Sequence, residues 1–169
     1  SLKKIPHNSF EGCCSLEEIS IPSSVKSIEY STFDGCHSLV NVTFEENSSL
    51  ASIGQFAFSK CYSLIKLELP SSLKAIDQFS FSECYAMKDF PFNKSCKLTT
   101  ISFNSFCLCK SLTKITIPSS VIIIENYSFN GCLSLNEVIF DEQSHLSSIC
   151  SSAFFDCKSL KHISIFLYI

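Results

Sequence analysis

The chain has 169 residues, of which 46% are hydrophobic and 17% charged, with a formal net charge of −3. This apolar content excludes a disordered chain, and basic residues that form no cluster argue against nucleic acid as the main partner. No apolar run reaches the roughly 18 residues of a membrane span, so we expect no direct insertion of this segment into a membrane.

A repeat runs through the whole chain, in seven copies. Each copy starts with an apolar anchor, followed three residues later by an isoleucine, then by a phenylalanine and a cysteine. The phenylalanines are Phe10, Phe33, Phe58, Phe81, Phe106, Phe129 and Phe154. The cysteines are Cys13, Cys36, Cys61, Cys84, Cys109, Cys132 and Cys157. Spacings of 23 and 25 residues alternate, and we expect residues 1–169 to form a single array cut from a longer protein.

Each copy ends in an alternating apolar pattern, as in Leu16-x-x-Ile19-x-Ile21. A period of two predicts a short strand with one buried face. A fixed repeat of 20–29 residues with this ending is the signature of a leucine-rich repeat solenoid. We therefore predict a curved parallel β-sheet on the concave side. Turns and short helical or 3₁₀ segments would form the outer side, between the isoleucine and the Phe-x-x-Cys pattern.

The fourth copy departs from this pattern. It has Phe90-Pro91-Phe92 where other copies have Ile-x-Ile. Proline cannot donate a hydrogen bond to a neighbouring strand. The sequence therefore predicts a distorted fourth coil.

Two stretches carry a family resemblance. Residues 33–39 (Phe-Asp-Gly-Cys-His-Ser-Leu) and residues 111–121 (Ser-Leu-Thr-Lys-Ile-Thr-Ile-Pro-Ser-Ser-Val) resemble the BspA-type, TpLRR-like leucine-rich repeats. The resemblance extends from Leu2 to Ile165. It implies a curved solenoid and a surface or secreted protein of a bacterium or protist, often an adhesin that contacts host matrix or cell-surface proteins.

The outward positions of the predicted concave sheet form our candidate protein-binding face. They are Glu18, Ser20, Asn41, Thr43, Lys66, Glu68, Asp89, Lys114, Thr116, Glu137, Ile139, His162 and Ser164. A polar face of mixed charge suits contact with a protein better than a small-molecule pocket. A solvated face that binds nothing would have the same composition.

Cysteine is the other abundant chemical group, with 11 copies. Seven recur beside the core columns, which favours a reduced, buried ladder over disulfide bonds, with bridging between coils as the alternative. Cys14, Cys96, Cys107 and Cys150 lie off the ladder and are candidate exposed thiols. We predict no zinc site, because the cysteines lack a histidine at finger spacing.

No nucleotide-binding, metalloprotease or nucleophile-elbow motif occurs. We therefore predict a non-enzymatic protein-recognition module without a cofactor, on the cell surface or outside the cell. The alternative is an intracellular, cytoplasmic scaffold or regulatory array, which a ladder of free cysteines favours.

Overall fold

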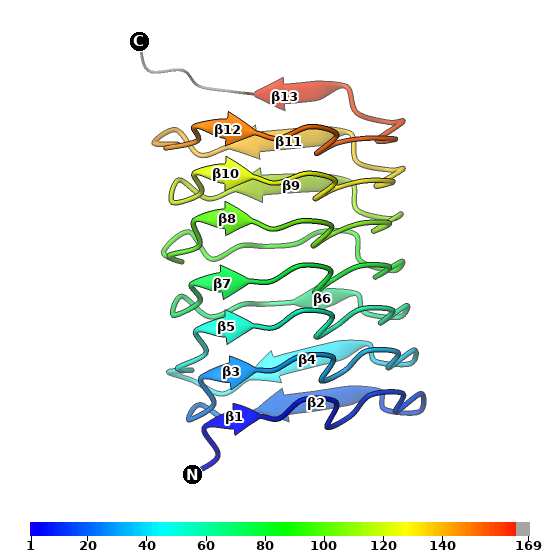
Figure 1. Ribbon diagram of the computed structural model, residues 1–169, viewed down its shortest axis with the longest axis vertical. Coiled ribbons are helices and arrows are strands. Elements are labelled where there is room, and N and C mark those ends of the chain that lie inside the picture. Colours follow the sequence, from blue (N-terminus) through cyan, green and yellow to red (C-terminus); the bar gives the residue numbers. More distant parts are fainter. Residues whose placement is uncertain (165–169) are drawn as a thin grey trace.

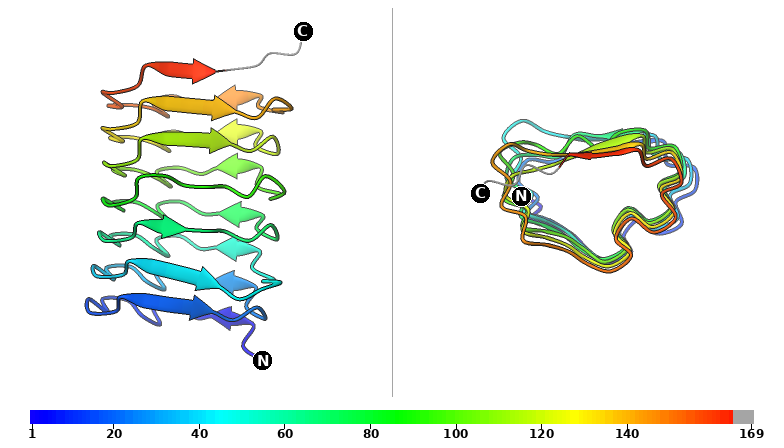
Figure 2. Two further views of the ribbon diagram at one scale, coloured as in Figure 1. Left: turned by 180° about the vertical axis from the view of Figure 1, so that it is seen from behind. Right: turned by 90° about the horizontal axis from the view of Figure 1, so that it is seen from above.

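The computed structural model describes residues 1–164, apart from the side chain of Lys66. The chain winds into a column of coils, each lying above the preceding one (Figure 1). Seen along the column, the coils superpose on one flattened outline (Figure 2). We number them one to seven, from the anchors Leu2, Val25, Leu50, Leu73, Leu98, Val121 and Leu146. The expected strand residue Ile165 and the segment after it lie outside the described residues.

Each coil contributes a short strand on one side of the column. These strands are β1 (Lys4–Ile5), β3 (Ser27–Ile28), β5 (Ser52–Ile53), β7 (Ala75–Ile76), β8 (Thr100–Ile101), β10 (Ile123–Ile124) and β12 (Ser148–Ile149). We call the outward side of these strands the short-strand face. Sequence reasoning assigned their isoleucines to a buried column but did not predict a strand there.

The predicted Ile-x-Ile strands lie on the opposite side of the column (Figure 2). They are β2 (Glu18–Ile21), β4 (Asn41–Phe44), β6 (Lys66–Leu67), β9 (Lys114–Ile117), β11 (Glu137–Phe140) and β13 (His162–Ser164). We call their outward side the long-strand face. All pairings on both sides are parallel, which confirms the predicted solenoid.

Coil four interrupts the long strands, as predicted from Pro91. No strand is formed there within residues 1–164, and only a single bridge joins Asp89 to Lys114. The long strands therefore form two sheets, β2-β4-β6 and β9-β11-β13. Phe90 and Phe92 still face the core, as the equivalent residues of other coils do, and meet Phe106 edge to face, with ring centroids 4.6 and 6.1 Å away.

The expected short helical segments are wrong: these stretches are successive turns, and no helix occurs in residues 1–164. The physical reason lies in the backbone. Every coil has two residues with positive φ, four positions apart, such as Asn8 and Gly12 or Asn104 and Leu108. A left-handed residue ends a right-handed helix, so no helix can extend through the segment.

The seven repeated phenylalanines fill the interior of the stacked coils. Five of them, from Phe33 to Phe129, have no exposed area. Their rings stack from coil to coil with centroids 5.1 to 5.5 Å apart and planes within 11° of parallel. One repeat cannot bury such a ring alone, so the core exists only in the stack.

The cysteine column forms a second ladder beside the rings. Each thiol from Cys36 onward donates a hydrogen bond to the carbonyl of the phenylalanine in the preceding coil, with Sγ–O distances of 3.1 to 3.3 Å. All eleven cysteines are free, so the ladder holds no disulfide. The thiol fits this position because it is small and apolar yet satisfies a buried carbonyl.

Candidate functional site

The long-strand face carries two rows of side chains that the strand register holds side by side. The first row places Glu18 beside Asn41 and Lys66, and then Asp89 beside Lys114, Glu137 and His162. The second row pairs Ser20 with Thr43, and Thr116 with Ile139 and Ser164. The structure therefore brings the predicted residues onto one face.

Among the described side chains of the two rows, Glu137 and Ile139 are half-buried and the others are exposed. Their placement agrees with an outward face, because Ile19, Val42 and Val138 between them point into or toward the core.

The N-terminal half of the long-strand face is hollowed. A cavity of about 350 Å³ is lined by Asn41, Thr43, Phe44 and Glu68, together with Val42. A neighbouring one of about 290 Å³ extends across Asn41 and Thr43 to β2. The two share Asn41 and Thr43 and so form one depression over β2, β4 and the chain after β6.

The C-terminal half instead carries an ion pair. Lys114 Nζ lies 3.0 Å from Glu137 Oε2, with both side chains partly exposed. Such surface pairs contribute little to stability, about 0–1 kcal/mol.

The short-strand face has a groove that sequence reasoning missed. One cavity of about 280 Å³ reaches from His7 past Glu29 and Tyr30 to Gln55 and Asp77. A second, of about 310 Å³, continues from Gln55 and Asp77 to Glu125. A signal was present in the sequence, because Glu29, Asp77 and Glu125 recur 48 residues apart.

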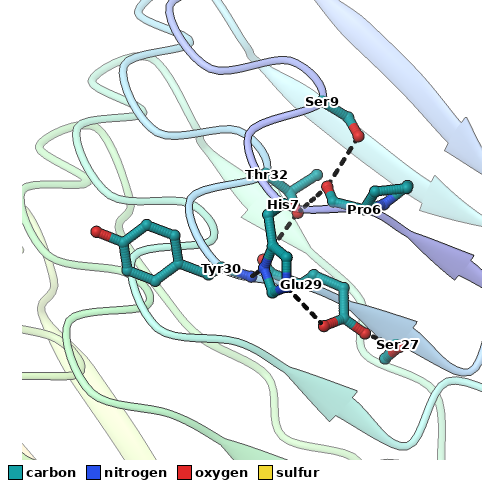
Figure 3. A network of polar contacts seen from close by, with 7 residues as sticks. All are labelled: Pro6, His7, Ser9, Ser27, Glu29, Tyr30 and Thr32. Atoms are coloured by element: carbon teal, nitrogen blue, oxygen red, sulfur yellow. Dashed lines mark hydrogen bonds and ion pairs between the residues drawn. The ribbon is translucent and has the colours of Figure 1, made fainter.

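A polar network closes one end of this groove (Figure 3). The backbone N–H of Tyr30 donates to His7 Nδ1 at 3.1 Å, so the other ring nitrogen faces Glu29 Oε2, 3.7 Å away. The Ser27 hydroxyl donates to Glu29 Oε1 at 2.6 Å. Glu29 is thereby held along the short strand, while the Tyr30 ring projects away from it (Figure 3).

The buried cysteines are chemically inert. Burial raises the pKa of Cys36 to about 11 and that of Cys61 and Cys84 well above the usual range. Since the thiolate is the reactive form, these thiols resist oxidation and metal binding.

Two of the four candidate exposed thiols are corrected by the structure. Cys96 and Cys107 are buried, at 6% and 9% exposure, because the loop and turn that carry them fold over the core. Cys14 is exposed, and Cys150 is half-buried.

Within residues 1–164, no cluster of His, Cys, Asp and Glu could hold a metal ion. A search of the described part of the chain finds no helix that could cross a membrane.

Comparison with known proteins agrees with this geometry. The family model described as the BspA type leucine rich repeat region matches in six copies, over residues 3–110 and 99–167. The crystal structure of a leucine-rich repeat protein of T. pallidum is 30% identical, with a TM-score of 0.82, and the match covers 94% of this chain and 72% of that one. The comparison with curated proteins gives no match.

Two further crystal structures share the fold. A leucine-rich cell surface protein of Faecalibacterium prausnitzii is 28% identical, with a TM-score of 0.83, over 95% of this chain and 42% of that one. A leucine-rich repeat protein of Bacteroides ovatus is 24% identical, with a TM-score of 0.70, over 88% and 43%. This chain therefore spans less than half of either protein.

Proposed function

Because this chain belongs to the BspA-type leucine-rich repeat family, we propose that it is a recognition module on the cell surface or outside the cell, in the manner of an adhesin. Its partners would be proteins, such as host matrix or cell-surface proteins. It would bind them through the long-strand face, without a cofactor or a chemical reaction.

One observation carries this proposal: two rows of polar side chains stand in register above a shared depression at Asn41 and Thr43. The rows mix acids, bases and neutral groups, which is typical of a non-obligate protein interface. A rigid parallel sheet presents them with little ordering cost on binding.

The free cysteines are compatible with a place outside the cell. The ladder thiols from Cys36 to Cys132 are buried. Burial raises the pKa of Cys36, Cys61, Cys84 and Cys109, and a hydrogen bond with Cys157 together with burial raises that of Cys132. A thiol that is neither ionised nor accessible does not exchange with disulfides, whatever the compartment.

A second candidate function is an intracellular scaffold or regulatory array. The observation that favours it is the absence of any disulfide among eleven cysteines. Disulfides are rare in reducing compartments and frequent in small secreted domains.

Antibody labelling of intact and permeabilised cells of the source organism separates the two. The surface proposal expects labelling of intact cells. Labelling only after permeabilisation would reject it in favour of the intracellular array.

The binding face is tested by one pair of matched substitutions. Thr43→Arg places a long cation in the depression, whereas Ser71→Arg adds the same charge at an exposed turn beyond the strand. We expect Thr43→Arg to weaken binding to an immobilised matrix-protein panel by about tenfold or more, as for a clash in an interface core. Equal binding by both variants would contradict the assignment of the long-strand face.

A further inference from the structure

A second line of aromatic rings runs along the outside of the column, beside the short strands. Its rings touch from coil to coil, with centroids 4.8 to 6.5 Å apart. We call it the aromatic ridge, and its members are His7, Tyr30, Phe56, Phe79, Phe103, Tyr127 and Phe155. Tyr30, Tyr127 and Phe155 are 45%, 38% and 59% exposed.

The ridge keeps a ring in every coil although the sequence position shifts. Tyr30 and Phe103 lie two residues after their coil's isoleucine, whereas Phe56, Phe79 and Tyr127 lie three after it. These last three have φ of 57° to 58°, which bulky residues rarely adopt. Equivalent positions elsewhere hold residues such as Asn8 and Asn104, for which this backbone is easier. Strain accepted to present a half-exposed ring points to a role beyond folding.

The groove beside the ridge is acidic at regular intervals. Glu29, Asp77 and Glu125 line it in every second coil, and the positions between them are Gly54 and Ser102. Gly54 has no room for a side chain, because a Cβ would lie 2.9 Å from the Glu29 carbonyl carbon. Among the described residues that line the two cavities there are three carboxylates and no lysine or arginine.

Asp77 is the centre of this line. No group within residues 1–164 makes a hydrogen bond or ion pair with its carboxylate, and partial burial raises its pKa. Asp77 is exposed, and an unpaired surface carboxylate is stabilised by any cation that reaches it. Glu29 and Glu125 each accept protein hydrogen bonds, at 2.6 and 2.7 Å, but a carboxylate has further lone pairs for a ligand.

The spacing of the acids selects the shape of the partner. Two coils of a parallel sheet rise by about 9.6 Å. A polyproline II helix has three residues per turn, so every third side chain lies on one edge at intervals of about 9.3 Å. A β-strand repeats its facing side chains at about 6.7 Å and loses this match after one step.

We propose that the short-strand face binds a proline-rich segment of a partner protein in the polyproline II conformation, lying lengthwise in the groove with lysine or arginine at every third position. The cations meet Glu29, Asp77 and Glu125. The prolines pack against the aromatic ridge, as in other aromatic-lined grooves that recognise this conformation. Ring faces add attraction for the cationic side chains. This surface is separate from the long-strand face of the proposed function.

The test uses a fluorescein-labelled peptide of five Pro-Pro-Lys repeats, titrated with the whole chain and read by fluorescence polarisation. We expect saturable binding that Asp77→Asn weakens by about threefold or more, since the central charge partner in the groove is lost. The matched control Glu46→Gln removes the same charge at an exposed turn after β4 and is expected to leave binding unchanged. Tyr127→Asn, which suits the left-handed backbone, is expected to weaken binding without unfolding the ridge.

Three outcomes would overturn the proposal. The first is no saturable binding of the peptide. The second is equal weakening by Asp77→Asn and Glu46→Gln, which would mean attraction by net charge alone. The third is equal affinity for a peptide of the same composition with its lysines grouped at one end. Loss of partner binding by Thr43→Arg has no bearing here, so the two proposals fail separately.

Discussion

The two aromatic ladders of this solenoid follow different rules. In the inner ladder, phenylalanine occupies one repeat position in all seven coils, and the rings stack within 11° of parallel. In the aromatic ridge, residue type and position vary, and most ring pairs are tilted by 61° to 85°. Close packing fixes the first ladder because an enclosed site admits one shape. The ridge is partly exposed to solvent, so packing there requires a ring but not one ring type or one sequence position.

The largest expected effect is a difference in stability between two substitutions in one coil, one in the inner ladder and one in the aromatic ridge. Phe58→Ala should lower the free energy of unfolding by about 3–5 kcal/mol, as for other buried aromatic rings. Phe56→Ala, two residues earlier in the ridge, should cost less than about 1.5 kcal/mol, because a half-exposed ring leaves no cavity. Urea unfolding measures both, and equal losses would mean that the ridge is part of the core.

The cysteine ladder gives the next effect. Cys84→Ala removes the donor to the buried Phe58 carbonyl, 3.3 Å away, and should cost about 1–3 kcal/mol. Cys84→Ser keeps a donor of similar size and should recover part of that loss. If serine were as damaging as alanine in the same unfolding experiment, packing of the sulfur rather than its hydrogen bond would be what matters.

A smaller difference in stability, between two substitutions of one ridge residue, measures the backbone strain. Phe56 has a φ of 58°, so Phe56→Asn should be more stable than Phe56→Ala by about 1 kcal/mol. Both substitutions remove the ring, so their difference reports the backbone alone. Thermal unfolding of the two variants side by side provides the measurement. The absence of a difference would show that this backbone carries no strain.

Asp77 should show the smallest effect, and one that depends on pH. Its folded-state pKa is raised by partial burial, so the folded protein holds this proton more tightly than the unfolded chain. Its contribution to stability therefore falls as pH rises through the window above the ordinary value near 3.8. Asp77→Asn should slightly stabilise the protein at neutral pH, with the gain disappearing in acid. A neutral-pH loss of stability would indicate that the carboxylate has a structural partner.

Much of the fold could be predicted because the repeat is long and strict. Columns of apolar residues at intervals of 23 and 25 can be buried only if the coils stack, and stacking brings Ile-x-Ile segments together as parallel strands. The missing long strand of coil four could also be predicted, because Pro91 has no N–H to donate to a neighbouring strand. The polar residues between the strand isoleucines face outward because successive side chains of a strand point to opposite sides.

The features that could not be predicted from the sequence depend on contacts between coils. The turns replaced helices because residues such as Phe79 and Leu108 adopt left-handed conformations that their own propensities do not favour. The second set of strands, only two residues long each, needed pairing with a strand of an adjacent coil to form. The aromatic ridge joins rings from unequal repeat positions, and Asp77 gained its unpaired setting from the coils above and below. Sequence periodicity thus determined the core and the outward side chains of the long-strand face, whereas the aromatic ridge arises from stacking of residues at non-equivalent repeat positions.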